Sequence, residues 1–398
     1  MKIAFFSDNF YPELSGITDT IITTTKELKR RGHEILYVGP YYSPQNYTLA
    51  NRQFPQRPED DAIDGMRILR LPSWHMPLSP TGQSRIVPAF AALPDGLRAF
   101  APDLIHTHSP YGVGLAAVRA ARRLAVPLVG TNHTAIEDFF PPGMRAIMRR
   151  WDAHYYNHCD FVSAPYARLI ERMRTAGFAK PGRAVSNPAD VHEFMLPTPK
   201  ERAEHREAFG LTGPTLLYAG RLGVEKRVDV MVRATALLVK QFPTFTFVAT
   251  GHGAARRSLE RLAQRLGIGT HVRFTGYLSR AALPHVYQAA DVFGMTSTSD
   301  SQSLALMQAY ASGLPAVLAR ARGLPDYAPK ECSFLIEPGD AKAFAEAAAL
   351  VLGDESRRAQ MSVAAAAYVT RFDPSLIAGE WERIYLDTIS ARAARSSS

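Results

Sequence analysis

The chain alternates short apolar runs with longer stretches whose apolar residues recur every three or four positions. Runs such as Lys2–Phe6 and Thr215–Ala219 have the length of strands, whereas residues 17–31 carry an apolar stripe typical of an amphipathic helix. A strand, a helix and a further strand in this order predict βαβ units, in which helices cover a parallel sheet. Because both halves of the chain show the pattern, we expect an α/β fold throughout.

The length of the chain predicts two domains. At 398 residues it is too long for one ordinary hydrophobic core. Residues 186–200 are rich in Pro and polar side chains and lie between two halves of similar pattern, so we expect the linker there. Helical patterns dominate after residue 339, and a last helix is expected to begin near Pro374.

The chain is basic, with a formal net charge of +9. This excess indicates an anionic partner such as nucleotide phosphates, nucleic acid or an acidic lipid surface, although an ordinary basic surface explains it equally well. The sequence contains no helix-turn-helix, zinc-finger or aromatic ribonucleoprotein pattern, which argues against nucleic acid. Nucleotide phosphates and lipid are therefore the anionic partners that we consider.

Cysteine use and apolar run lengths indicate a cytoplasmic protein. Cys159 and Cys332 are the only cysteines and lie far apart, so we expect buried thiols in a reducing compartment. The N-terminal residues have the pattern of a first strand and not of a signal peptide. No uninterrupted apolar run approaches the roughly 18 residues that a membrane-spanning helix needs.

Residues 296–319 combine a polar loop, a helix and a buried strand. Ser, Thr and Asp fill positions 296–303, apolar residues follow from Leu304, and Gly313 ends the predicted helix. Asp300 and Ser303 are therefore expected at the carboxyl edge of a sheet and at a helix N-terminus, where backbone N–H groups bind phosphate or sugar oxygens. Capping of the helix alone is the simpler explanation of the same pattern.

A second loop brings two cations to the same predicted edge. The segment GRLGVEK, which starts at Gly220, follows a strand directly and carries Arg221 and Lys226. A diphosphate leaving group needs two such cations, because Arg offers a bidentate fork and Lys a point charge. Either residue alone would be an ordinary surface cation.

The sequence predicts no metal site. A metal would be the other way to stabilise a diphosphate, but no Asp-x-Asp pair stands at a strand end. Asp60, Asp61 and Asp64 lie in the long polar segment 40–66, which we expect to be an insertion or mobile loop with these acids on a solvated face. We therefore expect a metal-independent site.

Three histidines follow predicted strands of the first half. His106, His108 and His133 lie at the same expected sheet edge as the loop of Gly16. Since side chains alternate along a strand, we expect one of His106 and His108 to point into the sheet packing and the other outward. A histidine such as His133, beside Thr134, can orient an alcohol or stabilise nearby positive charge; a purely structural, hydrogen-bonded histidine is the alternative.

Residues 145–159 predict a basic amphipathic helix. Ile147, Met148 and Trp151 share one face, and three basic residues surround them: Arg145, Arg149 and Arg150. Such a helix can lie on an anionic membrane surface. A surface helix that packs its apolar face inward is the simpler explanation.

The order of these motifs resembles the retaining GT-B glycosyltransferases of family 4. The resemblance extends from Met1 to about Leu386 and rests on the following residues and segments: the Gly16 loop, His106 and His108, His133 with Thr134, NPAD at Asn187, GRLGVEK at Gly220, ATGHG at Ala249, VRFTGYLS at Val272, AADVF at Ala289, and 296–319. The resemblance implies two Rossmann-like domains facing across a cleft, residues 1–194 for the acceptor and 195–372 for the nucleotide sugar. It further implies that residues 373–398 form a helix returning to the first domain.

The resemblance also implies roles for individual residues. Arg221 and Lys226 correspond to the pair on the donor diphosphate, and Asp300 to the first acid of a signature of two Glu separated by seven residues. The remaining donor contacts would come from Gly16, Ser301, Gln302, Ser303, Leu304 and Gln308. His108, His133 and Thr134 would face the acceptor, with His133 also near the reacting carbon. Together His133, Arg221, Lys226 and Asp300 form the expected catalytic set.

Three positions depart from the family pattern. Asp300 stands for the first Glu, Gln308 for the second, and Ser303 for the usual glycine. Charge-assisted hydrogen bonds are about twice as strong as neutral ones, so Gln308 is expected to weaken donor binding by about 1 kcal/mol without abolishing it.

The resemblance implies a retaining hexosyltransferase that uses a UDP- or GDP-linked sugar as co-substrate and no other cofactor. The acceptor would be a hydroxyl, with a membrane lipid or lipid-linked glycan at the inner face of the membrane as the candidate. A nucleotide-sugar-binding subunit without turnover and a GT-B nucleotide-sugar epimerase are the alternatives, and product formation without an acceptor distinguishes the latter.

Overall fold

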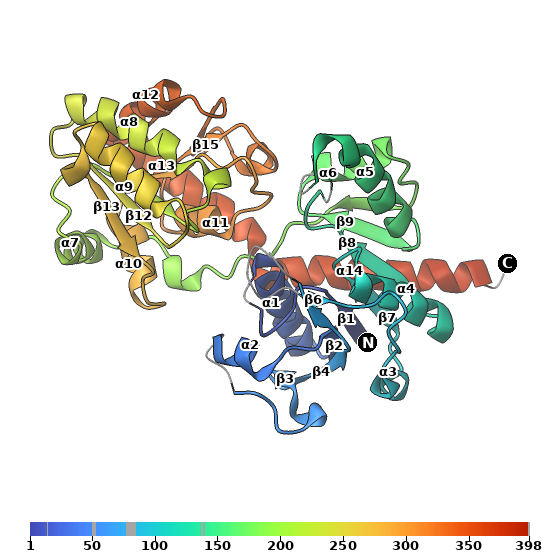
Figure 1. The fold of residues 1–398 in the computed structure, drawn as a ribbon. Coiled ribbons are helices and arrows are strands. Elements are labelled where there is room, and N and C mark those ends of the chain that lie inside the picture. The colour runs from blue at the N-terminus through green and yellow to red at the C-terminus, as the bar shows by residue number, and fades with distance from the viewer. Residues whose placement is uncertain (14, 50–52, 77–84, 136, 138–139, 397–398) are drawn as a thin grey trace. The chain divides into compact units, whose positions relative to one another are not determined.

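The computed structural model describes residues 1–13, 15–49, 53–76, 85–135, 137 and 140–396 (Figure 1). The chain divides into two compact units. The N-terminal unit comprises Met1–Pro188 together with Pro374–Ser398, and the C-terminal unit comprises Ala189–Asp373. The boundary at Pro188 lies within the segment 186–200 in which we expected the linker, and slightly before residue 194, where we expected the first domain to end.

The N-terminal unit is built on an eight-stranded sheet of order β10-β9-β8-β7-β1-β2-β4-β3. Neighbouring strands are parallel except for β3 and β4, which pair antiparallel. The strands are β1 (Lys2–Phe6), β2 (Glu34–Pro40), β3 (Ala62–Ile63), β4 (Met66–Leu71), β7 (Leu104–Thr107), β8 (Leu128–Thr131), β9 (Phe161–Ala164) and β10 (Gly182–Ala184). A separate antiparallel pair consists of β5 (Trp74–His75) and β6 (Arg85–Ile86).

Helices connect the parallel strands of this unit, as the βαβ pattern predicted. They are α1 (Gly16–Arg30), α2 (Pro44–Leu49), α3 (Asp95–Phe100), α4 (Gly112–Leu124), α5 (Pro142–Tyr156) and α6 (Ala167–Thr175). The long helix α14 (Pro374–Ser396) belongs to the same unit although it follows the C-terminal unit in sequence. Figure 1 shows α14 in red, lying along the blue and green elements of the N-terminal unit.

Burial of one face attaches α14 to the first strands and helix. Ile377, Trp381 and Tyr385 belong to the same buried cluster as Phe5 and Ile21. Polar contacts flank this cluster: Arg31 Nη2 donates to Ser375 O over 2.7 Å, and His33 Nε2 lies 2.9 Å from Glu382 Oε1. The C-terminal helix therefore completes the N-terminal core, which confirms that it returns to the first domain.

The C-terminal unit repeats the architecture with a six-stranded parallel sheet of order β13-β12-β11-β14-β15-β16. Its strands are β11 (Thr215–Ala219), β12 (Thr246–Thr250), β13 (Val272–Gly276), β14 (Val292–Met295), β15 (Ala316–Ala319) and β16 (Ser333–Ile336). Its helices are α7 (Pro199–Ala208), α8 (Val228–Gln241), α9 (Arg256–Arg265), α10 (Ala282–Ala289), α11 (Leu304–Ala311), α12 (Ala341–Leu352) and α13 (Glu355–Val369). Both units are Rossmann-like, as expected.

The polar segment 40–66 is more ordered than the sequence indicated. It contains α2, a short 3-10 helix (Pro58–Asp60) and β3, and Tyr47 within it is fully packed. The expectation that Asp61 lies on a solvated face is wrong: Asp61 is buried and its Oδ2 accepts a hydrogen bond of 2.6 Å from Arg70 Nε. Asp60 is exposed, as expected. An ion pair formed only in the folded chain thus removed Asp61 from water.

Among the described residues, no helix is both long enough and apolar enough to cross a membrane.

The packing of α14 generates a stability prediction. Trp381 is 5% exposed, and its ring lies 4.6 Å from that of His106. We expect Trp381→Ala to lower the free energy of unfolding by about 3–5 kcal/mol, because it removes a large side chain from a closed core. Urea unfolding followed by circular dichroism measures the loss. Leu386→Ala, on the half-exposed face of the same helix, is the control and should change stability little; equal losses in the two variants would contradict the packing role.

Candidate active site

Two exit loops of the C-terminal sheet pack against each other at its carboxyl edge. The loop after β11 begins at Gly220, whose N–H donates to Thr250 O over 3.0 Å, and Leu222 N donates to His252 O over 2.8 Å. A Cβ atom on Gly251 would lie 2.0 Å from Gly220 O, so only glycine permits this approach. The pairing fixes the backbone from which Arg221 and Lys226 project.

A third loop, residues 296–303 after β14, is bonded to the same turn. Thr298 N donates to Glu225 O over 3.1 Å, and Thr296 Oγ1 donates to Arg227 O over 2.7 Å. These bonds bring Asp300 to Lys226, whose Nζ lies 2.8 Å from Asp300 Oδ1. Both side chains are more than four-fifths buried. The structure therefore unites two of the expected site residues that are 74 positions apart in sequence.

The second oxygen of Asp300 is left for another donor. Among the described residues, Asp300 Oδ2 is buried without a hydrogen-bond partner. Buried polar atoms are rarely left in this state, because the lost hydration is not replaced. The carboxylate can thus hold Lys226 through one oxygen and accept a hydroxyl through the other.

Arg221 is held by a carboxylate that the sequence analysis missed. The Arg221 guanidinium forms an ion pair with Glu225, four residues further along the same turn, and more than half of the Arg221 side chain is exposed. The i, i+4 spacing of an acid and a base was the available signal. Each of the two cations in this loop is therefore paired with a carboxylate of its own.

The start of α11 has the geometry expected for a helix cap. Ser303 Oγ accepts a hydrogen bond of 3.4 Å from Leu306 N, so its hydroxyl serves the helix. Gln302 Oε1 accepts from Tyr327 over 3.1 Å, and Gln308 Oε1 accepts from Tyr287 over 3.1 Å. Ser301 and Leu304 flank the cap, and Leu304 is 40% exposed. The side chains at 302, 303 and 308 are thus oriented by the protein itself.

The histidines of the N-terminal unit form one buried cluster. His106 contacts Tyr385 Oη and Thr131 Oγ1, each over 2.8 Å, and His108 Nδ1 lies 2.9 Å from His133 Nε2. The expectation that His106 and His108 point in opposite directions is wrong, since their ring centroids are 4.1 Å apart. Residues two apart along a strand share a face, and only adjacent ones alternate.

Burial keeps these histidines neutral. Desolvation lowers the pKa of His106 and of His108 well below the usual value, and it lowers the pKa of His133 to about 4. Among the described residues, His108 Nε2 has no hydrogen-bond partner. At neutral pH the cluster can therefore orient a hydroxyl by hydrogen bonding, but it carries no positive charge.

A buried acid fixes the loop of His133. Asn132 Nδ2 donates to Asp152 Oδ2 over 2.6 Å, and Asn132 Oδ1 accepts from the Thr134 N–H over 3.2 Å. Desolvation raises the pKa of Asp152 to about 8. Asp152 was not among the expected site residues. The sequence feature that could have identified it is a single acid between the apolar positions of a predicted helix. Thr134 itself is exposed.

Asp8 orders the neighbouring loop after β7. Its Oδ2 accepts from Ser109 Oγ over 2.6 Å, and its Oδ1 accepts from the Val113 N–H at the start of α4 over 3.0 Å. Gly16 begins α1 behind the cap residue Ser15, and a Cβ added to Gly16 would meet no atom within 4 Å. The packing of this unit therefore does not itself require glycine at position 16.

The described residues contain no group of three or more His, Cys, Asp or Glu side chains placed to hold a metal ion.

Comparison with known proteins identifies the family. The family described as Glycosyltransferase Family 4 matches residues 14–193, and the family described as Glycosyl transferases group 1 matches residues 200–368. The GDP-mannose-dependent alpha-mannosyltransferase of Mycolicibacterium smegmatis is 30% identical over 377 residues, which are 90% of this chain and 90% of that protein. The chain is a family 4 glycosyltransferase.

Further similar proteins agree with this assignment. The alpha-monoglucosyldiacylglycerol synthase of Streptococcus pneumoniae is 27% identical over 328 residues, which are 80% of this chain and 70% of that protein. The crystal structure of HepE from Anabaena in complex with UDP has a TM-score of 0.78 and 19% identity, and the match covers 97% of this chain and 100% of that one. The glycosyltransferase therefore has the GT-B fold.

Helix α5 of this glycosyltransferase exposes much of its apolar face. Met144, Ile147 and Trp151 are 45%, 64% and 38% exposed, whereas Tyr155 is buried. The expectation that the helix packs its apolar face inward is therefore correct for the last turn of α5, but not for Ile147 and Trp151. Arg145 and Arg150 are exposed beside them. Arg149 Nε lies 3.4 Å from Glu137 Oε1, so this cation also has a structural partner.

The raised pKa of Asp152 generates a pH prediction. Between its usual value and about 8, the folded glycosyltransferase holds a proton at Asp152 that the unfolded chain releases. Asp152 therefore causes the free energy of unfolding to fall as pH rises through this window. Asn cannot titrate, so we expect Asp152→Asn to gain stability relative to the wild type by about 1 kcal/mol per pH unit across the window.

Urea unfolding at half-unit steps from pH 4 to pH 9 measures this difference. Asp387→Asn, at an exposed position of α14, is the matched control and should give a nearly constant difference from the wild type. A wild-type curve that stays parallel to that of Asp152→Asn would show that Asp152 is ionised throughout.

Proposed function

We propose that this glycosyltransferase moves a hexose from a nucleotide diphosphate sugar to a hydroxyl acceptor with retention at the anomeric carbon. One observation carries the proposal: Arg221 and Lys226 project from one turn, each held by a carboxylate, and Lys226 meets the loop that enters α11. Two cations and the N–H groups of a helix N-terminus are the groups that bind a diphosphate.

Donor binding would exchange these ion pairs for phosphate contacts. Glu225 and Asp300 neutralise the two cations. A diphosphate carries more negative charge than either carboxylate and would compete for Lys226 and Arg221. Asp300 would then accept hydroxyls of the sugar through its oxygens, with Gln308 on the ribose. Backbone N–H groups near Ser301 and Leu304 would complete the donor contacts.

The transfer itself would proceed on one face of the sugar. The bond from the anomeric carbon to the leaving phosphate oxygen breaks, the bond to the acceptor oxygen forms on the same face, and the acceptor proton passes to the leaving phosphate. Arg221 and Lys226 would stabilise the charge that grows on the diphosphate, which requires no metal ion. The neutral imidazole of His133, backed by His108, would hydrogen-bond to the reacting groups beside Thr134.

The similar proteins bear on the donor and the acceptor. The mycobacterial relative is named for GDP-mannose, and the Anabaena structure contains UDP, so we propose a UDP- or GDP-linked sugar. The streptococcal relative is named for a glucosyldiacylglycerol product, which supports a lipid acceptor. The exposed apolar residues and cations of α5 would lie on the anionic inner face of the membrane, from which a cytoplasmic enzyme could reach such an acceptor.

Donor specificity and the role of Lys226 can be tested together. We expect one of the UDP, GDP and ADP sugars to raise the stability of the protein by about 2.7 kcal/mol at 100 times its dissociation constant, seen as a thermal shift. Lys226→Ala should weaken the preferred nucleotide roughly thirtyfold in calorimetry, since about 2 kcal/mol of charge-assisted bonding is lost. Lys240→Ala, at an exposed site of α8, is the matched control.

Turnover then separates the candidate functions. Transfer to an acceptor, or slow hydrolysis of the donor, supports the glycosyltransferase. Tight binding without any turnover indicates a binding subunit, and a new nucleotide sugar formed without acceptor indicates an epimerase. Unchanged nucleotide affinity in Lys226→Ala would contradict the donor site.

The membrane surface has its own test. We expect the double variant Arg145→Glu, Arg150→Glu to lose most of its co-sedimentation with vesicles containing anionic lipid, because each cation near such a surface contributes about 1 kcal/mol. Arg257→Glu, Arg261→Glu on the exposed face of α9 is the matched control. Equal loss in both double variants would assign the binding to net charge and not to α5.

A further inference from the structure

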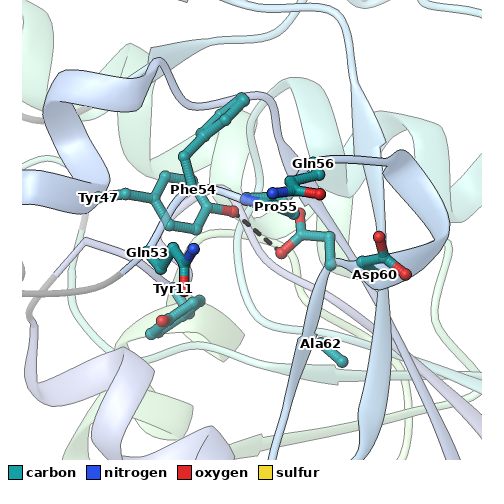
Figure 2. Close-up of a pocket in the computed structure, with 9 residues that line it drawn as sticks. Tyr11, Tyr47, Gln53, Phe54, Pro55, Gln56, Asp60 and Ala62 are labelled. Carbon is teal, nitrogen blue, oxygen red and sulfur yellow. Dashed lines mark hydrogen bonds between the residues drawn. The ribbon is translucent and has the colours of Figure 1, made fainter.

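A cavity lies in the N-terminal unit between Tyr11 and the polar segment 40–66, apart from the residues of the donor and histidine sites. It has a volume of about 280 Å³. Its walls include three aromatic rings, Tyr11, Tyr47 and Phe54, and three polar side chains, Gln53, Gln56 and Asp60. Figure 2 shows the rings on one side of the cavity and Gln56 and Asp60 on the other.

The aromatic wall is held in place by its neighbours. The ring of Tyr47 meets those of Tyr11 and Phe54 edge-on, with centroid distances of 5.9 and 5.2 Å. The Tyr47 hydroxyl donates to Asp61 Oδ1 over 2.9 Å and accepts from Arg70 Nη2 over 2.8 Å. The Asp61–Arg70 ion pair behind the wall therefore fixes the Tyr47 ring before any ligand arrives, which lowers the entropy cost of binding.

The polar wall has the chemistry that recognises hydroxyl groups. Gln56 is exposed and offers both N–H donors and a carbonyl acceptor, and Asp60 offers two acceptor oxygens. Gln53, beside the rings, is also exposed and adds a further amide. Aromatic faces opposite amide and carboxylate groups suit a ring with an apolar face and a hydroxylated rim. The charged residues further limit which ligand the cavity can bind. Two carboxylates, Asp60 and Asp61, line it, and one cation, Arg70, pairs with Asp61, so a phosphate group would meet net negative charge.

We propose that this cavity binds a neutral, hydroxyl-rich part of the acceptor, a sugar or polyol unit remote from the hydroxyl that reacts. The inference rests on the proposed glycosyl transfer and names the acceptor chemistry that this unit selects. It excludes an anionic headgroup as the occupant of the cavity.

The position of the cavity in the sheet agrees with a remote subsite. Tyr47 follows β2 and His133 follows β8, and these strands are separated by β7 and β1 in the sheet. Three strand spacings of about 4.8 Å separate the carboxyl ends of β2 and β8 by roughly 14 Å along the same edge of the sheet. An acceptor longer than one ring could therefore reach both places. Contacts so far from the reacting atoms would contribute to acceptor binding and specificity.

The test uses the full chain with saturating UDP, so that the donor site is occupied. Saturation-transfer NMR follows three neutral probes, maltose, α-1,6-mannobiose and myo-inositol, and one anionic probe, glucose 6-phosphate. We expect at least one neutral probe to bind the wild type. The double variant Gln56→Ala, Asp60→Asn should lower its affinity by at least about fivefold, the loss expected for one charge-assisted hydrogen bond. Glu59→Gln, an exposed acid beside Asp60 that does not line the cavity, is the matched control and should bind as the wild type does.

The outcomes separate this inference from the proposed function. Binding of glucose 6-phosphate and of none of the neutral probes would overturn the proposed subsite. So would a neutral probe that binds equally well to the wild type, the double variant and Glu59→Gln. No signal from any of the three neutral probes, with UDP still bound in calorimetry, overturns it as well and leaves the donor site standing. Absence of nucleotide binding by the wild type would instead contradict the proposed function.

Discussion

Parallel strand pairing is the constraint on which the loop clusters of both units depend. In a parallel sheet every strand ends at the same edge, so the loops that follow the strands are gathered there whatever their separation in sequence. In the C-terminal unit this gathers the loops after β11, β12 and β14, and in the N-terminal unit those after β7 and β8. Helix α14, far along the chain, also contacts the histidine cluster of the N-terminal unit, because Tyr385 hydrogen-bonds to His106.

Charge pairing organises the loops of the C-terminal unit. Asp300 and Glu225 pair with Lys226 and Arg221, so each of the two cations on this turn is neutralised by its own carboxylate. The glycine at position 251 is the steric counterpart, because any side chain there would collide with the backbone of Gly220. Position and charge are therefore set by different residues.

In the N-terminal unit, desolvation removes charge from the histidine cluster. His106, His108 and His133 are buried together and stay neutral, and a buried Asp152 holds Asn132 in the loop that carries His133. Neutral imidazoles bind hydroxyls through hydrogen bonds, whereas charged ones would attract the diphosphate of the donor. Under the proposed function the N-terminal unit would therefore favour an alcohol, and the proposed subsite, with Asp60 and Asp61 on its walls, would extend the same preference.

The sequence by itself determined the fold class, the main strands and helices, the linker region and the loops that carry the site, because apolar periodicity and turn residues are local properties. It also placed the cations 221 and 226 and the acid 300 at one sheet edge, which follows from parallel pairing alone. Strands β9, β10 and β16 were not expected from the sequence. Only the tertiary structure decided the partners of charged and polar side chains. The pairing of Asp61 with Arg70, the burial of Asp152 and the shared face of His106 and His108 depend on which neighbours exclude water, and that is settled by contacts between distant segments.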